Sequence, residues 1–145
     1  MTIDIYLYYL LNITIIHKED IVDISEGVME IVFNKAAYLS LHEMSVGQHL
    51  DFPDNTFVDA VTMGVFTIGH APPESFDELI RITEPGGYII FSVRADVYLE
   101  KGFKERQKIL EKEGKCRLIE KTEPFQGLPL EDSEILNRIF VYNVL

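Results

Sequence analysis

Several residue types are scarce in this chain of 145 residues, and each scarcity narrows what the protein can be. The only cysteine is Cys116, which excludes an internal disulfide framework and a cysteine-based zinc site. The 13 basic residues are outnumbered by 24 acidic ones, for a formal net charge of −11. A surface that acidic repels phosphate, which argues against nucleic acid as a partner. We expect a reduced intracellular compartment, the cytoplasm.

A hydrophobic run long enough to span a membrane is also lacking at the start of the chain. Residues 1–18 form an atypical apolar segment that falls short of the roughly 20 residues a membrane helix needs. The segment has no basic start and no small-residue cleavage site, so it does not resemble a secretory signal. Its isoleucine and tyrosine content is typical of a buried strand. We expect residues 3–16 to lie in the core and no membrane association.

The length predicts one domain with one core, and the 47% apolar and 26% charged composition is typical of a globular protein. Strand-like and helix-like segments then alternate along the chain. Buried strands are expected at residues 21–24, 39–46, 60–66 and 88–93, with helices at 25–38, 74–82 and 98–115. This alternation predicts an α/β sandwich with a mostly parallel sheet.

The carboxyl-terminal part of the chain has two predicted features of its own. The helix over residues 98–115 is amphipathic, and its Leu99, Phe103, Ile109 and Leu110 are expected to pack on the sheet. Two more strands, at 116–122 and 135–144, follow without a helix between them. We therefore expect this last pair to be antiparallel.

Three strings resemble class I S-adenosylmethionine-dependent methyltransferases. VDISEGVMEIV (residues 22–32) resembles the family's second strand, where an acid at the strand end precedes a serine-capped helix. LDFPDNTFVDAV (50–61) resembles the turn into its fourth strand, and ELIRITEPGGYIIFSVR (78–94) resembles its helix, Pro-Gly-Gly turn and fifth strand. The stretch from residue 65 to 92 looks most like the methyltransferase-like group associated with the Williams–Beuren region. The resemblance covers the chain from about residue 20 onward.

What the resemblance implies is a Rossmann-like three-layer sandwich that binds S-adenosylmethionine and transfers its methyl group. It gives Asp23 the role of holding the cofactor ribose, because the two carboxylate oxygens match the spacing of the two ribose hydroxyls. A surface acid beside a helix cap is the alternative interpretation of Asp23. Nicotinamide-dependent enzymes use the same device, so Asp23 alone does not separate the two families.

Four more residues take expected roles from the same resemblance. Ser45 stands where the family usually carries an acid that binds the adenine amino group, and its hydroxyl can accept that hydrogen bond without a charge. Val46 either lines the adenine or belongs to the core. Gly64 and Val65 match positions near the transferred methyl group, with an ordinary β-bulge as the alternative for Gly64. No catalytic residue is identified, and the spacing of the four histidines predicts no metal site.

The front of the chain departs from the family pattern. There the family has a first strand followed by a glycine-rich loop, whose backbone amides hold the methionine part of the cofactor. The first glycine of this chain is Gly27, so no such loop precedes Asp23. We expect the first strand and its loop to be missing or replaced. On this interpretation residues 1–145 are a single partial domain, either an amino-terminally truncated product or a paralogue that has lost the cofactor.

Two functions therefore stay open. The first is an S-adenosylmethionine-dependent methyltransferase with an unknown small-molecule or protein acceptor, impaired in this short chain. The second is a non-catalytic methyltransferase-fold remnant or interaction module. The missing glycine loop favours the second function. The three later strings favour the first, at least as the function of the chain's ancestor.

Overall fold

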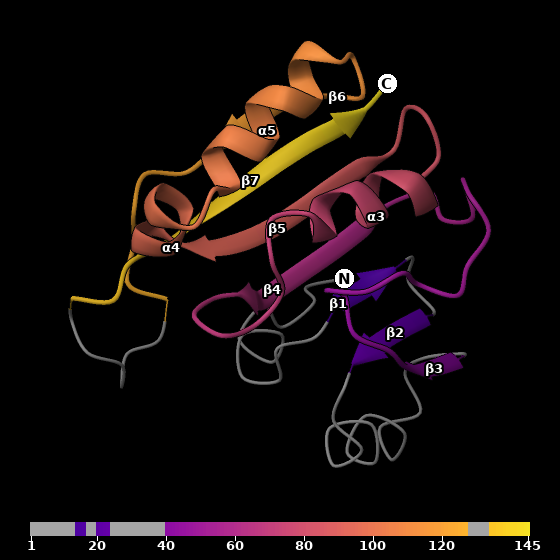
Figure 1. The fold of residues 1–145 in the computed structure, drawn as a ribbon, viewed down its shortest axis with the longest axis horizontal. Coiled ribbons are helices and arrows are strands. Elements are labelled where there is room, and N and C mark those ends of the chain that lie inside the picture. The colour runs from indigo at the N-terminus through magenta and orange to yellow at the C-terminus, as the bar shows by residue number, and fades with distance from the viewer. Residues whose placement is uncertain (1–13, 17–19, 24–39, 128–133) are drawn as a thin grey trace, which may run out of the picture.

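The computed structural model describes residues 14–16, 20–23, 40–127 and 134–145 (Figure 1). Within these residues a seven-stranded sheet has the order β3-β2-β1-β4-β5-β7-β6. Its strands are β1 (Thr14–Ile16), β2 (Asp20–Asp23), β3 (Ser40–Glu43), β4 (Ala60–Phe66), β5 (Tyr88–Arg94), β6 (Cys116–Lys121) and β7 (Asn137–Val144). The strands expected near residues 21–24, 60–66 and 88–93 are thereby confirmed.

The directions of the strands make the sheet mixed. β2 pairs with β3 in parallel, as β4 does with β5. β7 lies antiparallel between β5 and β6, which confirms the expected antiparallel finish. β1 lies antiparallel between β2 and β4. Five of the seven described strands therefore run one way, and the predicted α/β sandwich with a mostly parallel sheet is confirmed.

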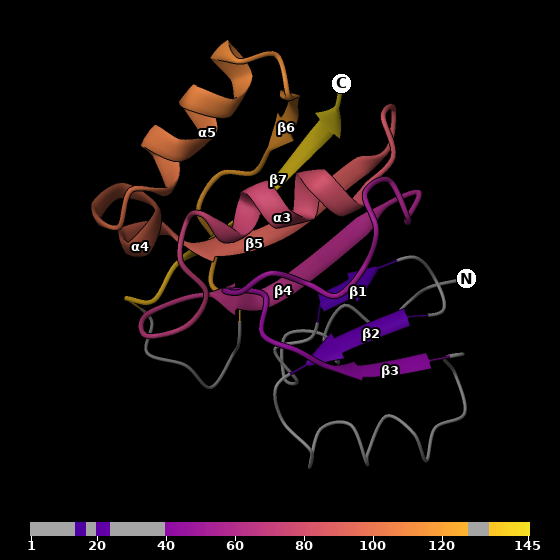
Figure 2. The same ribbon diagram turned by 45° about the vertical axis from the view of Figure 1, so that its right-hand side comes forward.

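Three described helices, α3 (Ser75–Ile82), α4 (Ala95–Glu100) and α5 (Phe103–Lys112), lie on one face of this sheet (Figures 1 and 2). The main core lies between them and the sheet. Phe91 of β5 packs against Phe66, Phe76 and Phe140 with ring centroids 5.0 to 5.4 Å apart. Leu79 and Ile82 of α3 are fully buried in the same core. Burying these large apolar side chains is the main stabilising contribution to this half of the domain.

The prediction of a single helix over residues 98–115 is wrong. The chain forms two shorter helices there, because Gly102 adopts a left-handed conformation with φ of 87° and separates them. Phe103 and Leu110 are buried as expected, but Leu99 is 63% exposed and Ile109 is 44% exposed. A helical pattern continued straight through Gly102 assigned Leu99 to the wrong face, whereas Ile109 lies within α5 but off the side that carries Phe103, Gln107 and Leu110.

One other expectation needs a smaller correction. The strand predicted at residues 39–46 is shorter, covering Ser40–Glu43 of β3. The helix predicted over residues 25–38 lies outside the described residues.

The Pro-Gly-Gly turn before β5 is held between β7 and the chain that leads into β4. A side chain at Gly87 would place its Cβ 1.9 Å from the carbonyl oxygen of Val58, so only glycine fits this close approach. Asn143 of β7 donates from its side-chain amide to the carbonyls of Gly86 and Gly87, at 2.8 and 3.1 Å. The turn thus sets how β5 enters the sheet between β4 and β7.

Candidate functional site

The carboxyl ends of β2 and β4 lie on the same side of the sheet, with β1 between them. We call this side, where the parallel strands end, the carboxyl edge. Thr14 of β1 pairs with Val22 on one side and with Thr62 on the other. Asp23, the last residue of β2, is therefore level with Met63 of β4. Two strand spacings, or about 10 Å, separate the two backbones. Ligands of open α/β sheets bind outside the carboxyl ends of strands, so this edge is the candidate site.

Gly64 forms a bulge in β4 at this edge. Its φ is 73°, and the pairing of β4 with β5 shifts register between Thr62 and Phe66. The Gly64 amide donates to the Ser92 hydroxyl oxygen at 2.9 Å, and Ser92 is only 1% exposed. The neighbouring strand thereby satisfies an amide that the bulge removes from the ladder. The bulge interpretation of Gly64 is what the structure shows, and the approach of a ligand stays a prediction.

The side chains of Val46 and Val65 are buried. They are 6% and 8% exposed, and both belong to the main hydrophobic core. Ser45, just before Val46, is partly buried, and its carbonyl accepts a hydrogen bond from the Gln48 amide at 3.0 Å. The core role that the sequence left open for Val46 is therefore observed. Contact of Ser45, Val46 or Val65 with a cofactor stays a prediction.

The loop after β3 packs against the loop after β4. A Cβ at Gly47 would lie 3.0 Å from Cδ of Pro72 and 3.8 Å from Cα of Ala71. The segment expected to bind adenine, Ser45 and Val46, therefore lies beside the chain that leaves the bulged end of β4. The fold brings these two parts of the predicted site together, with His70 exposed on the same loop.

The direction of β1 is the main difference from the arrangement that the resemblance implies. β1 holds the central place expected for the first strand. However, its last residue, Ile16, pairs with Asp20 and Ala60, the first residues of β2 and β4. The carboxyl end of β1 is therefore at the edge opposite Asp23 and not at the candidate site. A carboxylate at Asp23 fits a ribose diol by its chemistry, whereas a loop that follows β1 would begin at the edge away from it.

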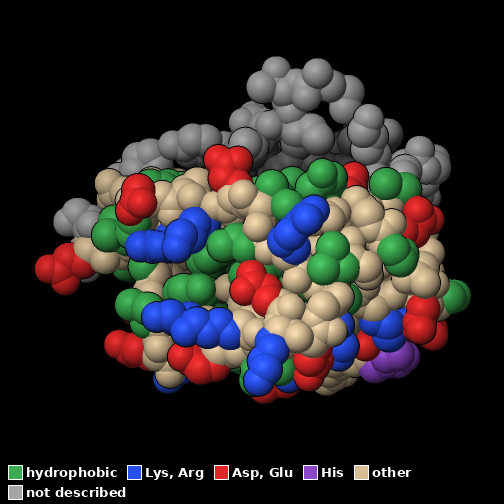
Figure 3. Space-filling view, turned by 90° about the horizontal axis from the view of Figure 1, so that it is seen from above, with side chains coloured by type: hydrophobic (Ala, Val, Ile, Leu, Met, Phe, Trp, Pro, Cys, Tyr) green, Lys and Arg blue, Asp and Glu red, His purple; other side chains and the backbone are tan. Residues whose placement is uncertain are grey.

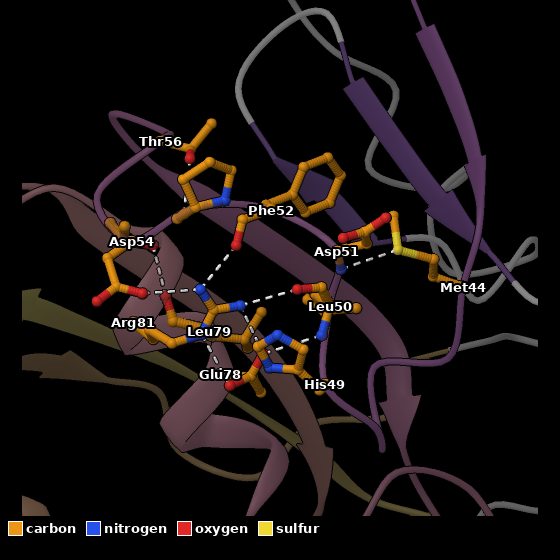
Figure 4. Close-up of polar contacts among 12 residues, drawn as sticks. Met44, His49, Leu50, Asp51, Phe52, Asp54, Thr56, Glu78, Leu79 and Arg81 are labelled. Carbon is orange, nitrogen blue, oxygen red and sulfur yellow. Dashed lines mark hydrogen bonds and ion pairs between the residues drawn. The ribbon is translucent and has the colours of Figure 1, made fainter.

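A cluster that the sequence analysis missed holds the loop between β3 and β4 (Figure 4). Arg81 of α3 donates to the backbone carbonyls of Leu50 and Phe52 at 2.9 and 2.7 Å, and to the Asp54 carboxylate at 2.9 Å. It also donates twice to Glu78, at 2.9 and 2.8 Å. The available signal was an acid and an arginine three residues apart on the polar side of α3, a pair that neighbouring helix turns bring together.

The charges of this cluster stabilise each other. The pKa of Glu78 is lowered to about 2, first by the hydrogen bond from Arg81 and further by the hydrogen bond from the Leu50 amide, the charge of Arg81 and the hydrogen bond with His49. The same hydrogen bond raises the pKa of Arg81. Both groups stay ionised in the folded state. The cluster positions the chain that connects the predicted adenine segment to β4.

The described part of the chain offers neither a metal cluster nor a membrane-spanning helix. No three histidine, cysteine or acidic side chains there gather closely enough to hold a metal ion. None of the described helices is both long and apolar enough to cross a membrane.

An α/β sheet with this order, its reversed β7 and an acid at the end of β2 define a Rossmann-like fold of the methyltransferase class. The sequence also matches a family model, described as a methyltransferase domain, over residues 7–91, which is more than half of the chain. The chain belongs to this methyltransferase domain family. No curated protein sequence matches it.

Solved structures similar to this chain share its fold at low sequence identity. One is a SAM-dependent methyltransferase from Methanosarcina mazei, 12% identical, with a TM-score of 0.60 over 86% of this chain and 80% of that one. Another is the N-methyltransferase NodS from Bradyrhizobium japonicum, 13% identical, with a TM-score of 0.61 over 86% and 72%. The PH0226 protein from Pyrococcus horikoshii OT3 is 17% identical, with a TM-score of 0.59 over 88% and 72%.

Proposed function

We propose that the chain is a methyltransferase-like protein whose candidate site takes S-adenosylmethionine weakly, so that methyl transfer to its acceptor is impaired. The observation that carries this proposal is the reversed β1 between β2 and β4. It leaves the ribose-binding position Asp23 at the carboxyl edge while directing the following chain to the other edge. The family match and the structural neighbours support the cofactor class.

The expected affinity follows from what the site retains. One charged contact to the ribose contributes about 1.5–3 kcal/mol, whereas association costs at least about 4 kcal/mol in lost freedom. In a complete site the glycine loop adds several backbone hydrogen bonds that offset this cost. Without them we expect a dissociation constant for S-adenosylmethionine weaker than about 1 mM.

The finer assignments belong to the same proposal. Asp23 holds the ribose, Ser45 and Val46 meet the adenine, and Gly64 and Val65 form the floor near the methyl group. The string from residue 65 to 92 supports placement in the Williams–Beuren-region group, and a small molecule or a protein in the cytoplasm is the acceptor class. A non-catalytic interaction module is the second candidate, and the reversed β1 favours it.

Calorimetric titration of the purified chain with S-adenosylmethionine tests the proposal. The Asp23→Ala variant removes the ribose contact, and Asp51→Ala removes an exposed carboxylate of the same type from the loop after β3. We expect weak binding that Asp23→Ala abolishes and Asp51→Ala leaves unchanged. A micromolar dissociation constant lost only in Asp23→Ala would make the chain a working methyltransferase and contradict the impairment.

A further inference from the structure

Among the strands that the structure describes, β6 is the edge strand at one end of the sheet. It pairs with β7 on one side, and no described strand pairs with its other side. An open edge offers unpaired backbone amides and carbonyls to another chain. Figure 3 looks down on this end of the molecule and shows basic and acidic side chains interspersed over its surface.

Two oppositely charged side chains of β6 lie on the same face of the sheet. Arg117 pairs with Asn143 and Glu120 pairs with Val141, and these two β7 residues share a face because they are two positions apart. Arg117 and Glu120 are three positions apart, so a regular strand would put them on opposite faces. The bulge between Leu118 and Glu120 brings them to one face. Both are exposed, and neither forms an ion pair with another described residue.

We propose that β6 pairs antiparallel with β6 of a second copy of this chain, around a two-fold axis between Leu118 and Ile119. In this register Arg117 of each copy lies opposite Glu120 of the other, on the same face of a continuous sheet. Oppositely charged residues facing each other across an antiparallel pair are favourable. The exposed Ile119, 48% accessible, then meets Leu118 at the centre.

The register is selective because its neighbours lack these charge pairs. Moving the axis by half a residue in one direction puts Arg117 opposite Lys121, whose side chain lies on the other face of the sheet, and so leaves Arg117 without an acidic partner. Moving it the other way puts Arg117 opposite Ile119 and leaves the charges unpaired. A two-fold axis repeats each favourable contact, so the two ion pairs form together or not at all.

Analytical ultracentrifugation over a range of protein concentrations tests this pairing with charge-reversal variants. We expect the wild-type chain to dimerise reversibly, and Arg117→Glu and Glu120→Arg each to raise the dissociation constant about tenfold or more through like-charge contact. Mixing the two variants must restore association. In the mixed dimer, positions 117 and 120 that face each other across the interface again carry opposite charges, in both pairs. Circular dichroism checks that each variant is folded.

Lys112→Glu on the exposed side of α5 is the matched control, because it changes the net charge as Arg117→Glu does. We expect it to leave the dissociation constant unchanged. Glu120→Arg reduces the net negative charge of the chain, so general repulsion alone would strengthen association in that variant. A monomer at every concentration, or a mixture that associates no better than either variant alone, would overturn the proposal and show that the bulge and the charges protect the edge.

Discussion

Arg81 and Glu78 together hold both backbone groups of Leu50. The Glu78 carboxylate accepts from the Leu50 amide at 2.9 Å, and Arg81 donates to the Leu50 carbonyl at 2.9 Å. The two side chains are in turn joined through Nε–Oε1 and Nη2–Oε2 hydrogen bonds. A helix thereby fixes a loop that would otherwise run over the surface, and Leu50 is completely buried as a result.

Replacing Glu78 with glutamine should destabilise the fold by about 1–3 kcal/mol, because it removes the charged acceptor of a partly buried arginine. Urea denaturation of the purified chain measures this. Asp54→Asn is the control, since Asp54 is largely exposed and contributes one of the five hydrogen bonds of Arg81. We expect it to cost less than about 1 kcal/mol. Equal losses in the two variants would contradict the dominant role of Glu78.

The same pair makes stability depend on pH. The pKa of Glu78 is lowered from 4.5 to about 2 in the folded chain, so the unfolded chain binds this proton first as the pH falls. The contribution is complete above about pH 5 and is lost as the pH falls toward about 2. Denaturation curves of the wild-type chain and Glu78→Gln should therefore converge over this range. A constant difference between them would show that the charge of Glu78 is not the cause.

Gly87→Ala should destabilise the domain severely, by about 3 kcal/mol or more, because its Cβ would meet the Val58 carbonyl at 1.9 Å. Gly86→Ala is the matched control in the same turn. Gly86 has φ of 91° and open space where a Cβ would lie, so its replacement costs only the left-handed backbone strain of about 1–2 kcal/mol. Thermal unfolding compares them. Similar melting temperatures for the two variants would contradict the close approach of the Val58 carbonyl to this turn.

The bulge of β4 depends on one buried hydroxyl. Ser92→Ala removes the acceptor of the Gly64 amide and should cost about 1–3 kcal/mol. Ser75→Ala offers a matched control, because Ser75 is also buried but its hydroxyl has no hydrogen-bond partner among the described residues. Its removal should be neutral or slightly stabilising. Chemical denaturation compares the two variants, and an equal effect at the two positions would be evidence against the Gly64–Ser92 contact.

The parts of the fold that depend on local patterns could be predicted from the sequence. The apolar runs of β4 and β5, the Pro-Gly-Gly turn between α3 and β5, and the missing helix before β7 each carry their signal within a few residues. The direction of β1 could not be predicted, because its three residues pair with strands on both sides and their direction depends on long-range register. The Arg81 cluster was missed for a similar reason, since its partners in the loop after β3 are distant in sequence.

In the candidate site, too, the positions of residues at strand ends could be predicted from the sequence, but the burial of their neighbours could not. Asp23 at the end of β2 and Gly64 near the end of β4 follow from strand boundaries. The burial of Val65 does not, and for Val46 a core role was one of two alternatives, because period-two patterns become ambiguous when a bulge or a short strand shifts the faces. Gly102 shows the same limit in a helix, where one left-handed residue changed which side chains face the core.

Cys116 should be unreactive in the folded chain. It is 2% exposed, and burial, together with the charges of Glu111 and Asp77, raises its pKa to about 12. The thiolate is the reactive form, so the thiol stays protonated at about pH 8. A colorimetric thiol reagent should label no cysteine under native conditions and one cysteine per chain in denaturant. Rapid labelling of the native chain would contradict the burial of β6 against the core.

We propose that the candidate edge of the sheet holds the cofactor ribose at Asp23 and that the contacts to its methionine part are lost. Titrating the chain with S-adenosylmethionine and, separately, with adenosine, followed by ligand-observed NMR, tests this most directly. If only the nucleoside half is recognised, the two ligands should bind with dissociation constants within about threefold of each other, both near or above about 1 mM. Binding of S-adenosylmethionine about 100-fold tighter than adenosine, or about 3 kcal/mol, would show a working methionine site and contradict that loss.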